Sequence, residues 1–415
     1  MNTPVITGMG IVSPFGIGRE VFFDAIHEGR SGLGPVTLFD TNGFQARVAG
    51  EVKGFDPKNY LKPEDLKRVP RVVALGLAAS LEALKDASID PAGLSIEDQR
   101  RTGIVIGTGA GGIDFAEAQY AHFFNREVKK ATPYAISSSL VGMLSSELSI
   151  YLGFRGPSHV ISTGCTSSAD AIGYAARMIR HGEIDRMLTG GAEACITPGI
   201  VAGFERMKVV STAFNETPSR ASRPFNADRD GFVLAEGSWI FMLESLESAK
   251  KRNAKIYAEV AGYGSTCDAF HRVMMEPSGV EAARAMTLAM ADARVEKEKI
   301  DYVNLHGTST QMNDVTETLA VKIAFEGMTK ELFTSATKSM IGHPQGACSA
   351  AGVAASVYAL MRGEIPPTIN YENPDPQCDL NYTPNKAVKH KVDHALVNCL
   401  AFGSKNSALV LRNLK

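Results

Sequence analysis

The chain has 415 residues, of which 44% are hydrophobic, and its 43 Lys and Arg residues nearly balance its 45 Asp and Glu residues. The resulting net charge of -2 provides no global field that would select nucleic acid or an anionic membrane as a partner. The length predicts about two to three domains of ordinary size with a large buried core.

Residues 1–10 lead directly into a strand-like segment and lack the basic and apolar regions of a signal peptide. No uninterrupted apolar stretch approaches the length that spans a bilayer. The six cysteines are scattered without CxxC spacing, which argues against a disulfide framework and against a zinc ribbon. We therefore expect a cytoplasmic protein without a membrane anchor.

Short β-branched runs alternate with longer helical runs, a pattern typical of α/β layers. The first half predicts strands at 5–7, 101–106, 186–190 and 238–243, and helices at 71–87 and 169–181. The second half predicts strands at 256–263 and 302–306, helices at 279–293, 314–325 and 347–361, and a closing hairpin of 397–401 with 408–412. The scheme occurs twice, although identity between the halves is too faint to prove duplication. The basic stretch 250–255 marks the expected boundary, which gives an N-terminal unit of residues 1–253 and a C-terminal unit of residues 254–415.

Cys165 lies in the sequence Ser-Thr-Gly-Cys-Thr-Ser-Ser, just before a long amphipathic run. Gly164 permits a tight turn into a helix, and the dipole of a helix N-terminus lowers the pKa of a thiol, so the position suits a nucleophile. The alternative is a small buried core residue, which is the usual environment of a free cysteine.

His306 and His343 each follow a strand-like segment and are flanked by glycine or other small residues. Loops at strand ends commonly carry catalytic groups in α/β proteins. A neutral imidazole can donate Nε2–H to a thioester carbonyl on which negative charge develops. Core histidines bonded to backbone carbonyls are the alternative, and a metal site is disfavoured because no HExxH or comparable ligand spacing is present.

Polar side chains surround the first histidine in the sequence. Thr308 and Thr310 place hydroxyls where an amide-bearing substrate arm would be bound. Asp314 and Glu317 share a helix face and, together with Lys338, are candidates for a buried ion network that orients the histidines. β-Strand propensity for the threonines and a solvated helix face for the acids are the alternatives.

Two further features give weaker indications of a binding site. Residues 107–112 form a glycine-rich loop that fits neither phosphate-binding motif, and the turn at Phe402 places backbone N–H groups where an oxyanion could bind. Five basic residues are candidates for contact with an acidic partner, although ordinary surface positions are the simpler interpretation: Lys67, Arg68, Lys129, Lys130 and Lys208.

Taken together, the ordered motifs resemble the β-ketoacyl-acyl carrier protein synthases, and the resemblance extends over essentially the whole chain. It rests on seven blocks: residues 5–10, 155–158, 163–167, 223–226, 228–232, 306–310 and 366–370. The resemblance implies a thiolase-like fold of two pseudo-duplicated halves in α/β/α/β/α layers, a dimer, and a phosphopantetheine arm delivered by an acyl carrier protein. It implies no metal and no bound cofactor.

The resemblance also implies roles for individual residues. Cys165 would carry the acyl chain, and His306 and His343 would bind the malonyl thioester and promote decarboxylation. Phe402 would act as a gate and, with the N–H of Cys165, as an oxyanion hole. Thr308 and Thr310 would bind the pantetheine arm, and Lys338 with Glu317 would form a supporting ion pair.

The chain departs from the family pattern at several positions. The usual Gly-Phe-Gly-Gly-Thr-Asn loop is Ala-Phe-Gly-Ser-Lys-Asn at 401–406, which predicts a stiffer loop. A common Glu is Gly352, a common threonine is Val273, and Ala110 replaces a bulkier residue that often closes the acyl pocket. The segment 163–167 is more similar to ketosynthase subunits of type II polyketide systems than to most fatty-acid enzymes, and such subunits often pair with a chain-length-factor homologue.

Condensation in polyketide or other specialised biosynthesis is therefore the expected function, with housekeeping fatty-acid elongation as the alternative. A non-catalytic chain-length-factor-like partner is disfavoured because Cys165 and both histidines are present. A cysteine hydrolase would need a single histidine oriented by Asp or Asn. A thiolase would need a second active-site cysteine, for which Cys399 is the candidate.

Overall fold

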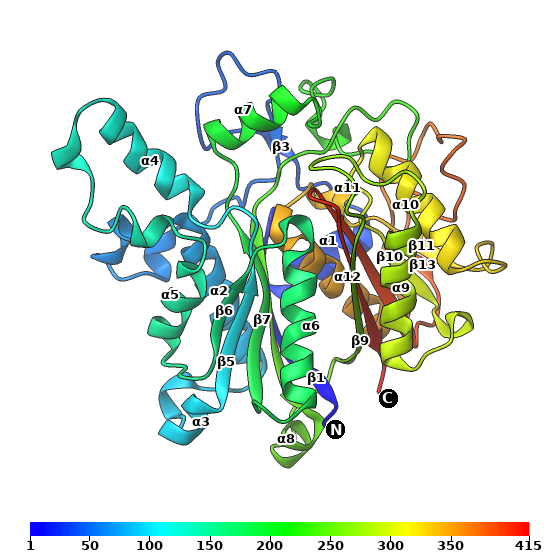
Figure 1. Cartoon of the computed structure of the whole chain (residues 1–415), viewed down its shortest axis with the longest axis horizontal. Coiled ribbons are helices and arrows are strands. Elements are labelled where there is room, and N and C mark those ends of the chain that lie inside the picture. The colour runs from blue at the N-terminus through cyan, green and yellow to red at the C-terminus, as the bar shows by residue number, and fades with distance from the viewer. Residues whose placement is uncertain (415) are drawn as a thin grey trace.

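The computed structural model describes residues 1–414, and one continuous eleven-stranded sheet forms its centre (Figure 1). Ten of its strands divide into two halves of five, which we call the first and the second sheet. The first sheet has the order β6 (Ser158–Ile161), β5 (Thr102–Gly107), β7 (Arg186–Glu193), β8 (Gly237–Ser245) and β1 (Pro4–Ser13). The second has the order β11 (Phe333–Ser335), β10 (Tyr302–Asn304), β14 (His394–Ala401), β15 (Lys405–Arg412) and β9 (Ala258–Cys267). A short pairing of Val5 with Glu259 and of Ile6 with Ala258 joins the two sheets.

The two sheets repeat one topology. In each, the second, third and fourth strands of the half are parallel, and the fifth and first are added antiparallel. The spatial order is third, second, fourth, fifth, first in both halves. The expected pseudo-duplication is therefore confirmed at the level of topology.

Helices complete a five-layer arrangement. α6 (Ser167–Arg180) and α12 (Cys348–Arg362) contact each other and strands of both sheets, so they form the middle layer. α2 (Arg71–Asp86) and α5 (Met143–Leu152) cover the first sheet, and α9 (Val280–Ala293), backed by α10 (Gln311–Ala324), covers the second. Residues 348–360 of α12 are all buried, as a helix between two sheets requires. The expected α/β/α/β/α layers are confirmed.

A pair of glycines in each half allows the outer helix to pack directly against the backbone of a strand. A Cβ on Gly10 would lie 1.9 Å from the carbonyl oxygen of Ala79, and one on Gly264 would lie 2.3 Å from that of Ala285. A Cβ on Gly8 would lie 2.2 Å from the carbonyl oxygen of Ala83, and one on Gly262 would lie 2.1 Å from that of Ala289. Only glycine permits this contact between strand and helix backbone, so the repeat appears in the chain as a Gly-x-Gly pair.

Each strand and helix expected from the sequence is present, with ends displaced by a few residues. The segment before His343 differs: it is the short helix α11 (Lys338–Ile341), whereas a strand-like segment was predicted. Among the described residues, no helix combines the length and the hydropathy needed to cross a bilayer. The remaining elements surround this core: α1 (Arg19–Glu28), α3 (Ile96–Arg100), α4 (Ile113–Phe124), α7 (Pro198–Met207), α8 (Leu246–Lys251), β2 (Gly16–Ile17), β3 (Gly34–Pro35), β4 (Val48–Ala49), β12 (Glu364–Ile365) and β13 (Val388–Lys389).

Candidate active site

Cys165 lies at the turn between β6 and α6, at the carboxyl end of the first sheet. Gly164 has φ of 71°, and Cys165 follows it in a single 3₁₀ turn that continues into α6. The buried carboxylate of Asp170, one helical turn further, accepts hydrogen bonds from the hydroxyls of Thr163 and Tyr263. This network fixes the turn, and the expected position of the thiol at a helix N-terminus is confirmed.

The thiol and both imidazoles converge. Cys165 Sγ lies 3.3 Å from His343 Nε2, and the rings of His306 and His343 lie 5.3 Å apart and nearly perpendicular. His306 follows the carboxyl end of β10, and His343 follows α11 after Gly342, whose φ is 76°. All three side chains are buried, with exposed fractions of 7%, 1% and 3% for Cys165, His306 and His343.

Lys338 fixes the protonation of His306. Its ammonium group lies 3.2 Å from His306 Nδ1 and donates to the His306 carbonyl oxygen at 2.7 Å. Since an ammonium group only donates, Nδ1 is the acceptor and the ring proton lies on Nε2. Burial first, and the Lys338 charge second, lower the pKa of His306 to about 3, so this imidazole is neutral at pH 7.

Glu317 fixes the loop of His306 through hydrogen bonds to its backbone. Its carboxylate accepts the backbone N–H groups of His306 at 2.6 Å and Gly307 at 2.7 Å, and the side-chain amide of Asn398 at 2.7 Å. Burial raises the pKa of this carboxyl to about 7 despite these three donors. Glu317 therefore positions His306 through its backbone.

The predicted ion pair between Lys338 and Glu317 is not formed. Within residues 1–414, no carboxylate lies within 4.0 Å of the Lys338 ammonium group. Asp314 does not complete a network with Lys338 either, because its carboxylate faces Arg229 at 3.4 Å. The glutamate that the family commonly has at position 352 could not pair with Lys338 in its place. A Cβ on Gly352 would lie 2.5 Å from Asn304 Oδ1, so there is no room for a side chain.

The Cys165 thiol is not the preformed thiolate that its helix position predicted. Burial raises its pKa, and this effect outweighs the opposing influence of the Lys338 charge and of the Phe402 backbone N–H, which points to the sulfur. Burial also lowers the pKa of His343. A neutral imidazole 3.3 Å from the thiol is consequently the available proton acceptor.

Two further thiols lie beneath the nucleophile. Cys348 and Cys399 each donate to the Cys165 carbonyl oxygen at 3.3 Å, and Cys399 Sγ lies 3.3 Å from His306 Nδ1. Neither sulfur lines the cavity that reaches Cys165. Cys399 therefore lacks the open approach to substrate that the thiolase alternative needs.

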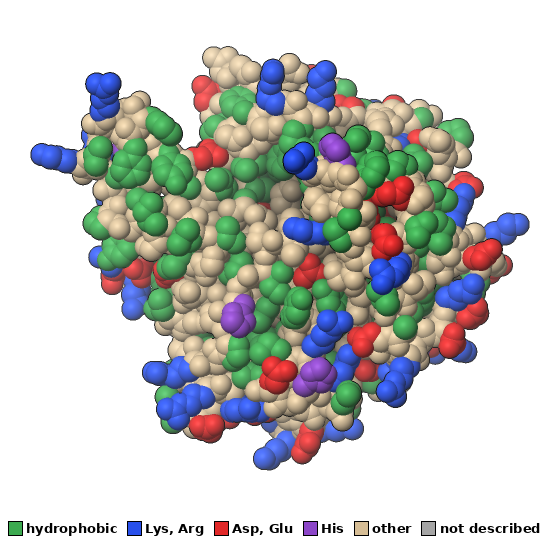
Figure 2. All heavy atoms as spheres, in the orientation of Figure 1, with side chains coloured by type: hydrophobic (Ala, Val, Ile, Leu, Met, Phe, Trp, Pro, Cys, Tyr) green, Lys and Arg blue, Asp and Glu red, His purple; other side chains and the backbone are tan. Residues whose placement is uncertain are grey.

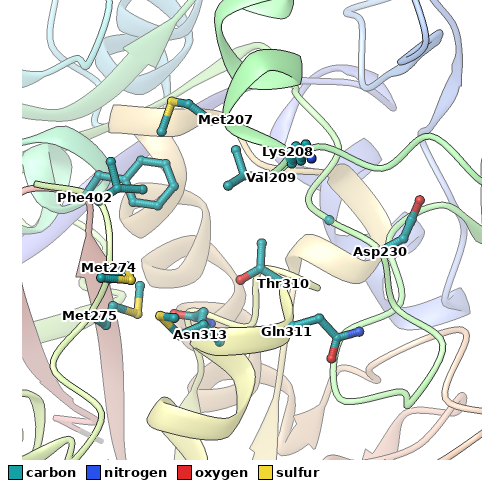
Figure 3. Close-up of a pocket in the computed structure, with 13 residues that line it drawn as sticks. Met207, Lys208, Val209, Asp230, Met274, Met275, Thr310, Gln311, Asn313 and Phe402 are labelled. Carbon is teal, nitrogen blue, oxygen red and sulfur yellow. The ribbon is translucent and has the colours of Figure 1, made fainter.

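An apolar vestibule leads to the site from the surface (Figure 3). This outer cavity has a volume of about 280 Å³, and a small inner cavity of about 20 Å³ borders Cys165 and both histidines. Phe402, Met275 and Thr310 line both cavities, so they form the passage between them. Val273 and Lys208 line the vestibule.

The predicted arm-binding hydroxyls are at this passage. Thr308 and Thr310 line the inner cavity, and their hydroxyl oxygens lie 2.9 Å apart. Ala110 lines neither cavity and instead packs, half-buried, at the hydrophobic cluster that Phe402 also contacts.

The altered loop around Phe402 is fastened to its neighbour. Ser404 has φ of 65°; its hydroxyl accepts the N–H groups of Phe270 and His271 at 3.2 Å and donates to the His271 carbonyl at 2.9 Å. Gly403 donates its N–H to the Arg272 carbonyl at 2.9 Å. These bonds agree with the predicted stiffness of residues 401–406.

The five basic candidates are all exposed and fall into two groups. Lys67 and Arg68 lie next to the segment that follows Lys129 and Lys130, since the Arg68 guanidinium lies over the Tyr134 ring at 5.4 Å. Lys208 lies apart from them, at the end of α7 and the mouth of the vestibule.

Residues of the site that the sequence analysis did not single out are Phe232, Met275, Gln345, Cys348 and Leu400. Phe232 ends the motif 228–232 without an assigned role, Met275, Cys348 and Leu400 are ordinary core types, and Gln345 becomes notable only because it is buried. Two groups of buried side chains have donor atoms close enough for a metal, Cys165 with His306 and His343, and His306 with Cys348 and Cys399. The Lys338 ammonium occupies His306 Nδ1, which disfavours a cation in the second group, and the expectation of no metal stays a prediction.

Comparison with known proteins agrees with this geometry. The model of the N-terminal domain of beta-ketoacyl synthases matches residues 2–249, and that of the C-terminal domain matches residues 257–372. The 3-oxoacyl-[acyl-carrier-protein] synthase 2 of Vibrio cholerae is 41% identical over 412 residues, which cover 99% of each chain.

Solved structures of ketosynthases have the same fold. The ishigamide ketosynthase/chain length factor matches with a TM-score of 0.92 and 35% identity, and a type II polyketide ketosynthase, AntDE, in complex with its acyl carrier protein AntF matches with 0.89 and 31%. Both matches cover 100% of each chain. The chain therefore belongs to the beta-ketoacyl synthase family.

Proposed function

We propose that the chain catalyses the decarboxylative condensation of a Cys165-bound acyl group with malonyl-acyl carrier protein, which gives a β-ketoacyl-acyl carrier protein. The observation that carries this proposal is the convergence of one thiol and two neutral imidazoles at the inner end of an apolar vestibule. A hydrolase needs a charged orienter on a single histidine, whereas here the Nδ1 of His306 faces an ammonium group.

In the first half-reaction, His343 Nε2 takes the proton of Cys165 Sγ as the sulfur attacks the acyl thioester. The tetrahedral oxyanion is held by the backbone N–H groups of Cys165 and Phe402, and the carrier's thiol leaves with the proton. The contact of 3.3 Å between thiol and imidazole supports this step. It gives His343 a role in acyl transfer in addition to the role in decarboxylation that the resemblance implied.

In the second half-reaction, His306 donates Nε2–H to the malonyl thioester carbonyl, where negative charge accumulates as carbon dioxide leaves. The electron pair of the broken carbon–carbon bond forms the enolate, whose carbon attacks the Cys165 thioester. Collapse of the adduct forms the β-keto carbonyl and releases the Cys165 thiolate, which takes a proton from water by way of His343. Thr308 and Thr310 bind the amide-bearing phosphopantetheine arm that the carrier delivers, and Phe402 gates the passage.

Docking of the acidic carrier uses exposed basic residues at and away from the vestibule mouth. Lys208 at the vestibule mouth is placed to meet the phosphate of the arm, and Lys67, Arg68, Lys129 and Lys130 provide a separate exposed basic surface. The solved ketosynthase complex with an acyl carrier protein supports a partner of this class.

A dimer is the proposed assembly. β6 is an edge strand with a neighbour on one side only, and the adjacent lobe exposes large apolar side chains, which gather over α4 in Figure 2. These side chains include Tyr120, Phe123, Phe124, Val128, Ile136 and Leu140. An unpaired edge beside an apolar patch is typical of a surface covered by another chain. The partner is a second copy or a chain-length-factor homologue.

The boundary between the halves, the cellular location and the pathway are also proposals. The boundary between the two halves is placed between residues 253 and 254, supported by the repeated topology. The location is the cytoplasm. The pathway is polyketide or other specialised chain building, with fatty-acid elongation as the alternative that the name of the Vibrio cholerae relative favours.

The reaction is tested with purified protein, acyl-carrier protein and malonyl-carrier protein. Intact-mass spectra follow acylation of Cys165 and extension of the chain on the carrier, and trapped carbon dioxide follows decarboxylation. We expect one equivalent of acyl group on the protein and one carbon dioxide per extended chain. Acylation that is followed by hydrolysis, with no extended product, would refute the condensing function.

A further inference from the structure

Gln345 has a buried amide nitrogen for which no described residue provides an acceptor. Its side chain is 9% exposed, and its Nε2 has no hydrogen-bond partner in the described part of the chain. Its Oε1 lies 4.0 Å from Cys165 Sγ. A buried amide N–H without an acceptor is unfavourable, so this Nε2 is available to donate to a ligand that reaches it.

The backbone of Gln345 is held in an unusual conformation. Its φ is 34°, a left-handed value that is strained for a side chain other than glycine. The next residue fixes the turn, since Gly346 N–H donates to the buried Glu193 carboxylate at 2.8 Å, and a Cβ on Gly346 would lie 2.2 Å from the Gly109 nitrogen. The turn therefore directs the amide and leaves it little freedom to find another partner.

Gln345 contacts Cys165 from outside the inner cavity. It is not among the residues that line the inner cavity with His306, Thr308 and Phe402. Instead, a Cβ on Gly109 would lie 3.6 Å from Gln345 Cβ, beside the loop that the sequence resemblance associates with the acyl chain. Gln345 therefore packs against the glycine-rich loop 107–112, and we infer that an acyl group on Cys165 extends along this loop.

Chain geometry identifies which acyl atom the amide reaches. The third carbon of a thioester-bound chain lies about 4 Å from the sulfur, given ordinary bond lengths. Oε1 of Gln345 lies 4.0 Å from the sulfur, and Nε2 is bonded to the same carbon as Oε1, so we infer that its N–H groups reach an oxygen on the third carbon of the chain. A methylene at this carbon would leave the N–H groups desolvated and unpaired.

We propose that Gln345 is a specificity determinant that donates Nε2–H to an oxygen at C3 of the acyl chain on Cys165. The preferred acyl substrate is then a β-ketoacyl chain, as in unreduced polyketide building, over the saturated chain of fatty-acid elongation. The inference rests on the proposed condensing function and selects the substrate class of the same site.

The test compares two four-carbon primers, acetoacetyl- and butyryl-carrier protein, which differ only at C3. Intact-mass spectra give kcat/KM for acylation of Cys165 in the wild type, in Gln345→Met and in Gln377→Met, where Gln377 is an exposed control. We expect the wild type and the control to prefer acetoacetyl about tenfold, and Gln345→Met to bring this ratio close to one. Gln345→Gly, which also relieves the backbone strain, serves as a second variant in case the methionine disturbs folding.

The possible outcomes distinguish a failure of the specificity role of Gln345 from a failure of the condensing function. If both primers acylate the wild type equally well, or if Gln345→Met changes both rates in parallel, Gln345 has no role in specificity while the condensing function stands. If neither primer acylates Cys165, the condensing function itself fails and the inference fails with it.

Discussion

Lys338→Met isolates the part of the site that sets the proton of His306. The lysine is 5% exposed, and its contacts with His306 Nδ1 at 3.2 Å and the His306 carbonyl at 2.7 Å are the hydrogen bonds that its side chain makes among the described residues. Methionine has a similar length and cannot donate. His306 is then free to carry its single proton on Nδ1, which removes the Nε2–H donor from the malonyl thioester.

The magnitude follows from the type of bond that is lost. A hydrogen bond from a charged donor contributes about 1.5–3 kcal/mol, which corresponds to a decrease of about 10- to 100-fold in the rate of decarboxylation. Stability should not fall comparably, because the substitution removes a buried charge that has no carboxylate partner. Lys322→Met, at a partly exposed lysine that pairs with Asp379, is the matched control.

The pH dependence gives the decisive signature. In the wild type, the pKa of His306 is about 3, so this imidazole stays neutral between pH 8 and pH 5.5. Without the Lys338 charge, its pKa rises, and burial, which is the larger cause, still holds it below the ordinary value. Falling pH then generates the imidazolium, which carries Nε2–H again and restores activity to the variant.

The assay measures carbon dioxide release from malonyl-carrier protein at several pH values, with acylation of Cys165 measured in parallel. We expect the ratio of wild-type to variant decarboxylation to narrow as the pH decreases from 8 to 5.5. A variant whose decarboxylation rate equals that of the wild type at pH 8, or whose acylation of Cys165 falls as much as its decarboxylation, would refute the assignment of Lys338 as a positioning residue.

Four further predictions concern the thiol, the imidazole, the turn and the gate. Cys165→Ala should accept no acyl group in intact-mass spectra, and acyl loading of this variant would contradict the nucleophile assignment. Because the pKa of His306 is lowered to about 3, folding opposes its protonation, and the stability of the wild type relative to His306→Asn should fall by about 1.4 kcal/mol per pH unit below pH 6.5 in denaturant titrations; equal slopes would count against a buried neutral imidazole. Gly107→Ala would bring a Cβ to 2.3 Å from the backbone at the start of α6 and should lower the melting temperature, whereas Gly203→Ala, with no atom within 4 Å, should leave it unchanged or raised; equal effects would show that the close approach is unimportant. Ser404→Gly removes three hydrogen bonds and the strain at φ of 65°, so it should loosen residues 401–406 and increase their rate of hydrogen exchange, and unchanged exchange would contradict the role of this serine.

The sequence by itself determined the layers and the reacting groups. Alternation of short β-branched runs with helices predicted the strands and helices in order, because hydrophobic period is a local property that survives in the fold. Cys165, His306 and His343 could be found in the same way, since each is flanked by glycines or small residues that permit a sharp turn at a strand or helix end.

The tertiary structure alone decided how these groups are charged and connected. The sequence predicted a thiol activated by its helix and an ion pair between Lys338 and Glu317, but burial raises the pKa of Cys165, and Lys338 bonds to His306 instead. Both results depend on residues far apart in the chain, and on the dielectric environment that they create together, which no local pattern records. For the same reason the orphan amide of Gln345 is invisible in the sequence: a glutamine is noteworthy only once its neighbours are seen to leave it without a partner.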